Sequence, residues 1–312
     1  MELGLALLER LKGDVVLSPY GLARALSVIR DGATGETRTA LDAVVGEVPA
    51  VEGILSAQAA WLGQGYSPGP ALAGVDTGPL DIVRINAWSN EKTRGKIPRI
   101  LDGLSADEQF VLTDAEYLEA KWARPFAKAG VAPFEGAGEV PMMRVEGGFE
   151  HADGAVRMPY RKGDPRMVEL EGLSDLRFVA MLGEWREQQW RRGHGTIELP
   201  RFSTTSTLDL ADSLVALGLG PAFVAGGDLE NLVIGPGDKS LGRVLQRARV
   251  DVDELGTTAA ATTAVTVRMV SLRRDEPFHI VFDRPFTWAV EHAPTGTLVF
   301  VGRVLNPTER SA

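Results

Sequence analysis

The segment from Gly256 to Ser271 limits what this chain can fold into, because its side chains suit neither a core helix nor a solvated linker. Between Gly256 and Ala264 no side chain is bulky and apolar, so a helix here could not anchor a hydrophobic core. The segment also lacks the Lys, Glu and Pro that are typical of linkers. From Val265 onward, branched and polar residues alternate, which favours a strand. We therefore expect a segment that is exposed in one state and a buried strand in another.

A run of alanine and threonine is more often a helix start or a surface loop, and the residues alone leave both alternatives open. The neighbouring sequence favours a strand. Residues 249–253 alternate in the manner of a strand, and a segment rich in Phe and Pro that is typical of a hairpin follows the run. We therefore expect the run to connect a strand to a hairpin.

Composition excludes several classes of protein. The 312 residues are 44% hydrophobic and 24% charged, as in a soluble globular chain, and no linker divides them, so we expect one domain at 1–312. The formal net charge of −9 argues against a nucleic acid partner. There is no cysteine for disulfide or thiol chemistry, and no apolar run long enough to cross a membrane. No signal peptide is recognisable, so we expect a cytoplasmic protein, or a secreted one whose leader is absent from this sequence.

No combination of residues suggests an enzyme. The four histidines show no spacing typical of metal ligands. No nucleophile elbow, Walker loop or HExxH motif is present. Gly193-His194-Gly195 could mark a site, but we expect a surface turn there. We therefore expect neither a metal nor another cofactor.

Local patterns predict several elements. Residues 3–12 and 208–219 are expected to form amphipathic helices. Residues 15–17 are expected to form a short strand that runs into a helix. Ser18 is a suitable N-cap for that helix, because Pro19 would occupy its first position.

Several motifs occur in an order that resembles one protein family. Residues 254–262 read ELGTTAAAT, which is similar to the hinge of the reactive loop in inhibitory serpins. The sequences FDRPF at 282–286 and FVGRVLNP at 300–307 resemble the C-terminal signature of serpins. Further similar motifs are INAW at 85–88, TRGKI at 93–97, VPMM at 140–143 and LPRF at 199–202. The chain thus resembles an inhibitory serpin, in particular a compact prokaryotic member.

The resemblance implies an α+β fold with a large central mixed β-sheet, two smaller sheets, a cluster of helices and an exposed reactive loop at about 254–277. It also implies that a protease cuts the loop and is trapped as an acyl-enzyme when the loop inserts into the central sheet. The period of two along a strand places every second residue from Thr257 to Thr263 on one face, and all of these are small. The implied hinge residues are Glu254, Gly256, Thr257, Thr258, Ala259, Ala260, Ala261 and Thr262.

The resemblance also implies a region where the central sheet opens, formed by Ser18, Trp122, Arg201 and Gln246. Three positions there depart from the family. Gly21 replaces a usual Ser, Asp114 replaces a usual Asn, and Gln246 replaces a usual His. Arg201 and Glu254 are expected to lie together where the loop first enters the sheet, and their charges are complementary.

The expected partner is a target serine protease, and the protein is expected to be a monomer. A heparin-type cofactor is not expected, because the chain is acidic and the helix that carries this site in some relatives is missing. The main alternative is a non-inhibitory serpin that acts as a chaperone, carrier or storage protein. Such relatives tend to have bulky, charged or Pro residues in the hinge, which this hinge lacks. A protein that is cleaved without trapping the protease is a further alternative.

Family spacing from Glu254 places the reactive bond between Val270 and Ser271, and a Val there would suit elastase-like or subtilisin-like proteases. Arg273 and Arg274 are the alternative cleavage sites, and either would suit a trypsin-like protease. Mass spectrometry of the C-terminal fragment released from a protease complex distinguishes the two. We expect a fragment that begins at Ser271, and a fragment that begins at Arg274 or one residue later would make the target trypsin-like.

Overall fold

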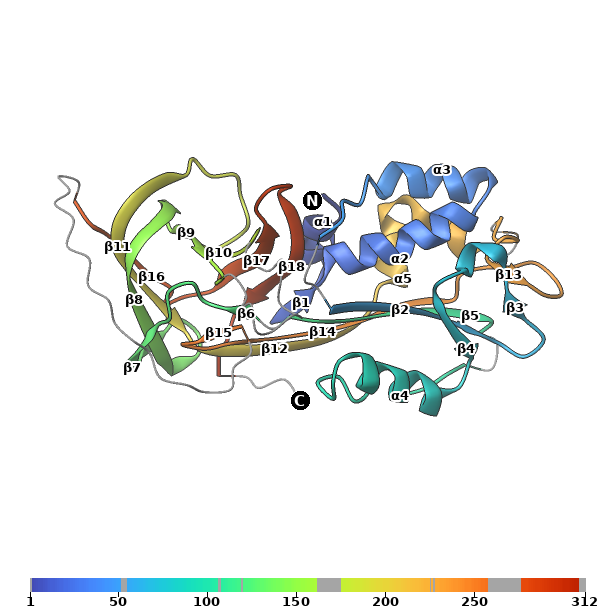
Figure 1. Cartoon of the computed structure of the whole chain (residues 1–312), viewed down its shortest axis with the longest axis horizontal. Coiled ribbons are helices and arrows are strands. Elements are labelled where there is room, and N and C mark those ends of the chain that lie inside the picture. Colours follow the sequence, from blue (N-terminus) through green and yellow to red (C-terminus); the bar gives the residue numbers. More distant parts are fainter. Residues whose placement is uncertain are drawn as a thin grey trace.

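The computed structural model describes residues 2–51, 55–105, 108–118, 120–161, 175–224, 226, 228–257 and 276–308. Within these residues, the helices gather toward one end of the molecule and long strands extend from there toward the other end (Figure 1). None of the described helices is long and apolar enough to cross a membrane. The helices and helical turns are α1 (Glu2–Arg10), α2 (Pro19–Gly32), α3 (Gly35–Val44), η1 (Pro70–Leu72), α4 (Ile82–Lys92), α5 (Ala211–Leu214), η4 (Val215–Leu219) and η5 (Gly220–Phe223).

A central sheet holds the middle of the fold. Its two inner strands, β5 and β14, lie side by side and parallel, from Val111 opposite Arg243 to Tyr117 opposite Arg249. The neighbouring pairs β2–β5 and β12–β14 are antiparallel, so the sheet is mixed, as the sequence predicts. Its strands in spatial order are β4 (Asp76–Pro79), β2 (Leu55–Leu62), β5 (Phe110–Tyr117), β14 (Arg243–Val252), β15 (Gly256–Thr257) and β6 (Ala120–Lys121), with β12 (Phe202–Asp209) paired to β14.

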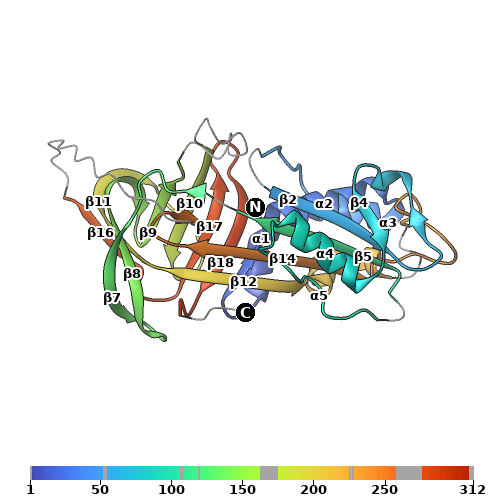
Figure 2. The ribbon, with the colours of Figure 1, turned by 60° about the horizontal axis from the view of Figure 1, so that its bottom comes forward.

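Helices cover both faces of the central sheet. Because side chains alternate along a strand, successive residues of β5 face different helices. Leu112 joins Ile29 of α2 in one buried cluster, whereas Val111 joins Ile85 and Trp88 of α4 in another. Figure 2 shows α4 in front of the sheet, with α2 behind it. The inner strands therefore cannot move without disturbing helix packing.

A second sheet runs across one end of the central sheet. Its strand β8 is 15 residues long and pairs with β11 over most of its length and with β9 at its end. The two smaller sheets that the sequence predicts are thus joined end to end through β8. In spatial order the strands are β1 (Val15–Leu17), β18 (Thr297–Val304), β17 (Phe286–His292), β10 (Leu176–Leu182), β9 (Ala155–Pro159), β8 (Gly138–Ala152), β11 (Arg191–Pro200) and β16 (Phe278–Val281), with β7 (Ala127–Phe134) beside β8. A small ladder also joins β3 (Ser67–Pro68) to β13 (Val233–Ile234).

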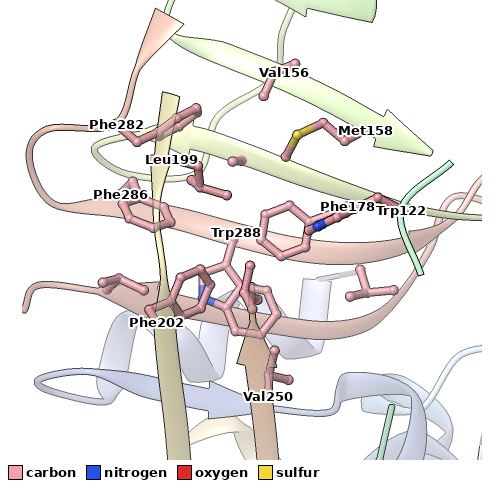
Figure 3. Packing of buried hydrophobic residues seen from close by; sticks show 14 of the residues in the cluster. Trp122, Val156, Met158, Phe178, Leu199, Phe202, Val250, Phe282, Phe286 and Trp288 are labelled. Atoms are coloured by element: carbon pink, nitrogen blue, oxygen red, sulfur yellow. The ribbon is translucent and has the colours of Figure 1, made fainter. Parts of the chain in front are cut away.

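The largest buried cluster lies where the two sheets meet. Trp288 of β17 stacks on Phe178 of β10, with ring centroids 5.5 Å apart and ring planes 11° apart. Phe202 of β12 and Val250 of β14 reach the same cluster from the central sheet (Figure 3). Each large apolar side chain buried here contributes roughly 1.5–3 kcal/mol, so the cluster holds the sheets together.

Two local expectations from the sequence need correction. Residues 193–195 lie in strand β11 and not in a surface turn. A Cβ on Gly195 would lie 2.2 Å from the carbonyl oxygen of Phe278, so this glycine allows β16 to approach β11. Residues 208–209 end strand β12, and the helix expected there begins only at Ala211.

Gly302 of β18 lies against the ring of Trp288. A Cβ on Gly302 would lie 2.6 Å from Trp288 Cε2 and 2.6 Å from the carbonyl oxygen of Val15. Because the strand backbone and the buried ring have no room to move, we expect Gly302→Ala to lower the free energy of unfolding by about 1–3 kcal/mol. Urea denaturation would measure the change. Gly46→Ala is the control, because nothing lies within 4 Å of a Cβ there, and equal losses in the two variants would contradict the interpretation.

Candidate functional site

The hinge begins where the chain leaves β14 and turns back into the central sheet. Asp253 holds this turn, because its Oδ1 accepts hydrogen bonds from the amides of Leu255 and Gly256 at 2.8 and 3.2 Å. The next two residues form strand β15, in which Thr257 lies opposite Val252 of β14. The reversal of the chain is therefore tight, and the Asp253 side chain holds it from within.

Strand β15 also pairs with β6, with Gly256 opposite Lys121 and Thr257 opposite Ala120. It therefore lies between β14 and β6 and runs antiparallel to both. Strand β6 follows β5 along the chain, and β5 is the parallel neighbour of β14. A continuation of β15 in the same direction would thus enter between β5 and β14, antiparallel to each of them.

Thr257 is docked in a buried polar site. Its Oγ1 lies 2.7 Å from the hydroxyl oxygen of Tyr160, and both residues are buried. The Tyr160 ring stacks on Trp122, with centroids 4.9 Å apart and planes 7° apart. Burial raises the pKa of Tyr160, so its hydroxyl keeps the proton at neutral pH. Thr257 of strand β15 is therefore held by a hydrogen-bonding partner inside the core.

The segment after β6 holds the turn from the other side. The indole Nε1 of Trp122 donates to the carbonyl of Asp253 at 2.8 Å, and its backbone amide donates to Leu255 at 2.9 Å. The amide of Phe126 donates to the carbonyl of Glu254 at 2.8 Å. Each such bond contributes roughly 0.5–1.5 kcal/mol net, so the three together fix the start of the hinge.

Arg201 and Glu254 lie together, with Arg201 Nε 3.4 Å from Glu254 Oε2. The Arg201 side chain is 45% exposed and that of Glu254 is 13% exposed. An ion pair with so exposed a partner contributes no more than about 1 kcal/mol. The backbone hydrogen bonds therefore hold the hinge more firmly than this pair does.

Ser18 and Gln246 meet at the start of α2. Gln246 Oε1 accepts from the Ser18 amide at 2.8 Å, and Gln246 Nε2 donates to the Ser18 carbonyl at 2.9 Å and to Asp114 Oδ2 at 2.7 Å. Ser18 is also the N-cap of α2, because its Oγ accepts from the Gly21 amide at 3.1 Å. The same Oγ donates to the carbonyl of Val299 at 2.7 Å. Ser18 therefore both caps the helix and links it to the sheets.

The residues predicted for the sheet-opening region thus form two groups. Ser18 and Gln246 join α2 to β14, whereas Trp122 and Arg201 contact the hinge. Other predicted residues lie outside the described part of the chain, namely Thr258, Ala259, Ala260, Ala261, Thr262, Val270, Ser271, Arg273 and Arg274.

The roles of Tyr160 and Asp253 were missed at the sequence level. The spacing of Asp253 and Gly256 is a turn signal that could have revealed the role of Asp253. No local pattern could reveal the role of Tyr160, because it lies 97 residues from Thr257 along the chain.

The described residues hold no group of three or more His, Cys, Asp or Glu side chains placed to bind a metal ion. His279 has one carboxylate partner, Glu198, at 3.2 Å, and its side chain is exposed. The contacts around the hinge are hydrogen bonds, aromatic contacts and the ion pair between Arg201 and Glu254. This arrangement suits the docking of a strand.

Comparison with known proteins agrees with this geometry. The family model described as "Serpin (serine protease inhibitor)" matches residues 75–307. This chain belongs to the serpin family. A serpin relative, the leukocyte elastase inhibitor of Bos taurus, is 31% identical over 72% of this chain and 66% of its own length.

Solved structures confirm the serpin fold. The native state of the thermophilic serpin tengpin matches with a TM-score of 0.81 at 22% identity, over 97% of this chain and 92% of that one. Thyroxine-binding globulin in complex with thyroxine matches with a TM-score of 0.78 at 20% identity, over 99% of this chain and 97% of that one. The serpin family therefore includes proteins named as protease inhibitors and a protein named for binding thyroxine.

In this serpin we expect Tyr160→Phe to lower the free energy of unfolding by about 1–3 kcal/mol, because Thr257 Oγ1 would stay buried without its partner. The double variant Tyr160→Phe/Thr257→Val removes both partners, so its loss should be smaller than the sum of the two single losses. Urea denaturation of the four proteins would measure the coupling. Strictly additive losses would contradict a hydrogen bond at the hinge.

Proposed function

We propose that this serpin inhibits a serine protease as a suicide substrate, and that its cut reactive loop becomes a strand at the seam. The seam is the border between β5 and β14 at residues 111–117 and 243–249. The observation that supports the proposal most directly is strand β15. Its two residues belong to the hinge, lie antiparallel to both neighbours and run toward the seam.

Insertion would replace one strand pairing with two. The parallel β5–β14 ladder would give way to two antiparallel ladders, which are slightly more stable per residue. Each new backbone hydrogen bond would contribute roughly 0.5–1.5 kcal/mol, whereas ordering each loop residue costs roughly 1–2 kcal/mol. Hydrogen bonds alone therefore do not decide the sign, and burial of side chains has to contribute.

The hinge sequence is suited to such burial. Continuing the register of β15 along β14 would place Ala259 opposite Val250 and Ala261 opposite Ala248. Val250 and Ala248 are fully buried, so the side chains beside them must be small. The alanines at these alternate positions meet that requirement, and Thr257 already occupies the first of them.

The target protease belongs to the same proposal. Family spacing supports a reactive bond at Val270–Ser271 and hence an elastase-like or subtilisin-like target. Arg273 or Arg274 would instead select a trypsin-like target. The name of one relative, leukocyte elastase inhibitor, favours the first choice.

A carrier function is the second candidate. The observation that favours it is a cavity of about 1030 Å³ between the start of α2 and strand β10. Its lining includes Tyr20, Met181, Trp185 and Trp190, which offer apolar surface to a small molecule. A carrier would bind its ligand there and form no covalent complex with a protease.

We also propose that residues 1–312 form one domain. The largest buried cluster includes Val16 near the start of the chain and Val304 near its end, together with Val250 of the central sheet. The two ends of the chain therefore share one core with the central sheet.

Incubation with subtilisin or an elastase should yield a covalent complex that survives SDS gel electrophoresis. Ala259→Arg should abolish most of it, because the continued register of β15 places this residue opposite the buried Val250, where an unpaired charge costs several kcal/mol and slows insertion. The acyl-enzyme would then hydrolyse, and cleaved serpin would accumulate. Thr39→Arg, which adds the same charge at an exposed position of α3, is the control and should trap protease normally.

Two outcomes would count against inhibition by insertion. An unchanged yield of complex in Ala259→Arg would show that this position is not buried during trapping. A complete lack of complex across subtilisin-, elastase- and trypsin-like enzymes would favour the carrier function.

A further inference from the structure

Two buried carboxyl groups face the start of α2. Asp114 and Glu116 lie two residues apart on β5 and are 1% and 0% exposed. Gly21 of α2 has no side chain, and this absence makes room for both carboxyl groups. A Cβ at position 21 would lie 2.0 Å from Glu116 Oε1 and 2.5 Å from Asp114 Oδ2. Those two oxygens are therefore no farther apart than the sum of the two distances. A side chain at position 21 would collide with both.

Asp114 lies at the seam and binds both strands beside its own. Its Oδ2 accepts a hydrogen bond from Gln246 Nε2 of β14 at 2.7 Å, and its Oδ1 accepts one from Gln58 Nε2 of β2 at 2.9 Å. Continuing the register of β15 would place Thr263 opposite Gln246. An inserted strand would therefore have to separate Gln246 from Asp114.

The surroundings favour one negative charge but not two. Among the described residues, the titratable groups that face Asp114 are Glu116 on β5 and Arg24 on α2, whereas β14 and β2 present the neutral Gln246 and Gln58. Burial raises the pKa of Asp114 to about 6, although hydrogen bonds from both glutamines and the charge of Arg24 lower it. Two neighbouring carboxyl groups in such a site resist losing both protons.

We propose that Asp114 and Glu116 form a proton-binding pair that keeps the seam closed in acid and lets it part near neutral pH. The inference rests on the proposed function in one respect, since it takes the seam to be the place where the loop enters. Neither residue has a role in cutting the loop. The pair would regulate how readily the strands separate.

The sign follows from proton linkage. In the closed sheet Asp114 keeps its proton up to about pH 6, whereas water reaching it in an open sheet would return its pKa toward 3.8. Between these two values the closed state binds more protons than the open state. The advantage of the closed state therefore falls as pH rises through this window, and it becomes constant above the higher value.

The test measures how fast a synthetic peptide that copies residues 258–268 anneals to the uncut protein as an added strand. No protease is present, so the measurement is independent of inhibition. With the two pKa values above, the annealing rate should rise about tenfold from pH 5 to pH 7 and then level off. Native gel electrophoresis would resolve the free protein from the complex.

Three variants assign the effect to the pair. The amide side chain introduced by Asp114→Asn cannot lose a proton, so the annealing rate of this variant should not change between pH 5 and pH 7. The variant retains all four histidines, which ordinarily titrate in this range, so a constant rate would exclude them as the cause. Glu116→Gln removes the neighbouring carboxylate, which should lower the pKa of Asp114. The rise in annealing rate should therefore occur at lower pH. Asp251→Asn is the matched control on β14. Burial opposes the charge of Asp251, but hydrogen bonds from Arg249 and Ser203 keep its pKa below the ordinary value, so this variant should keep the wild-type profile.

A wild-type rate that is constant from pH 5 to pH 7 would overturn the proposal, and so would a tenfold rise that persists in Asp114→Asn. A lack of annealing at every pH would also overturn it, because the strands would then not part at the seam. If annealing depends on pH but no protease complex forms, the proposed proton-binding pair is supported and the proposed inhibition is rejected. If protease complexes form but annealing does not depend on pH, the proposed inhibition is supported and the proposed proton-binding pair is rejected.

Discussion

The hydrogen-bonded border between β5 and β14 is the contact on which the rest of the structure depends. It is a parallel pairing in the centre of a mixed sheet, with the hinge strand β15 at one end and the start of α2 packed against it. Parallel pairing is slightly less stable per residue than antiparallel pairing. The centre of this serpin is therefore built with the weaker of the two ladders at the place where a new strand would enter.

Both faces of that border are held by side chains as well as by helices. On the α4 side, Asn86 Oδ1 accepts from the amides of Ile100 and Leu101 at 2.8 and 3.0 Å, and Arg247 of β14 donates to the carbonyl of Arg99. On the other side, Gln246 ties β14 to the start of α2. Parting the strands thus requires rearrangement on two layers, which favours the closed sheet kinetically.

Much of this arrangement could be predicted from the sequence. Strands show an alternation of apolar and polar residues, and the family motifs occur in the expected order. The strand ending at Asp253 and the hinge after it are examples. What could not be predicted are contacts between distant segments. At the sequence level Gly21 is only a departure from the family, whereas in the fold its missing side chain accommodates Asp114 and Glu116. Tyr160 gives no local signal for the same reason.

The tight turn at Asp253 has a consequence for the length of the loop. It sets Thr257 opposite Val252, and from there the alternation of a strand decides which side chains face inward. One residue added or removed before Thr257 would exchange the inward and outward sets along the whole inserted segment, whereas two would preserve them. If the loop inserts as proposed, the hinge of this serpin therefore obeys a parity rule: its length can change only in even steps, while the part of the loop beyond the buried segment is under no such restriction.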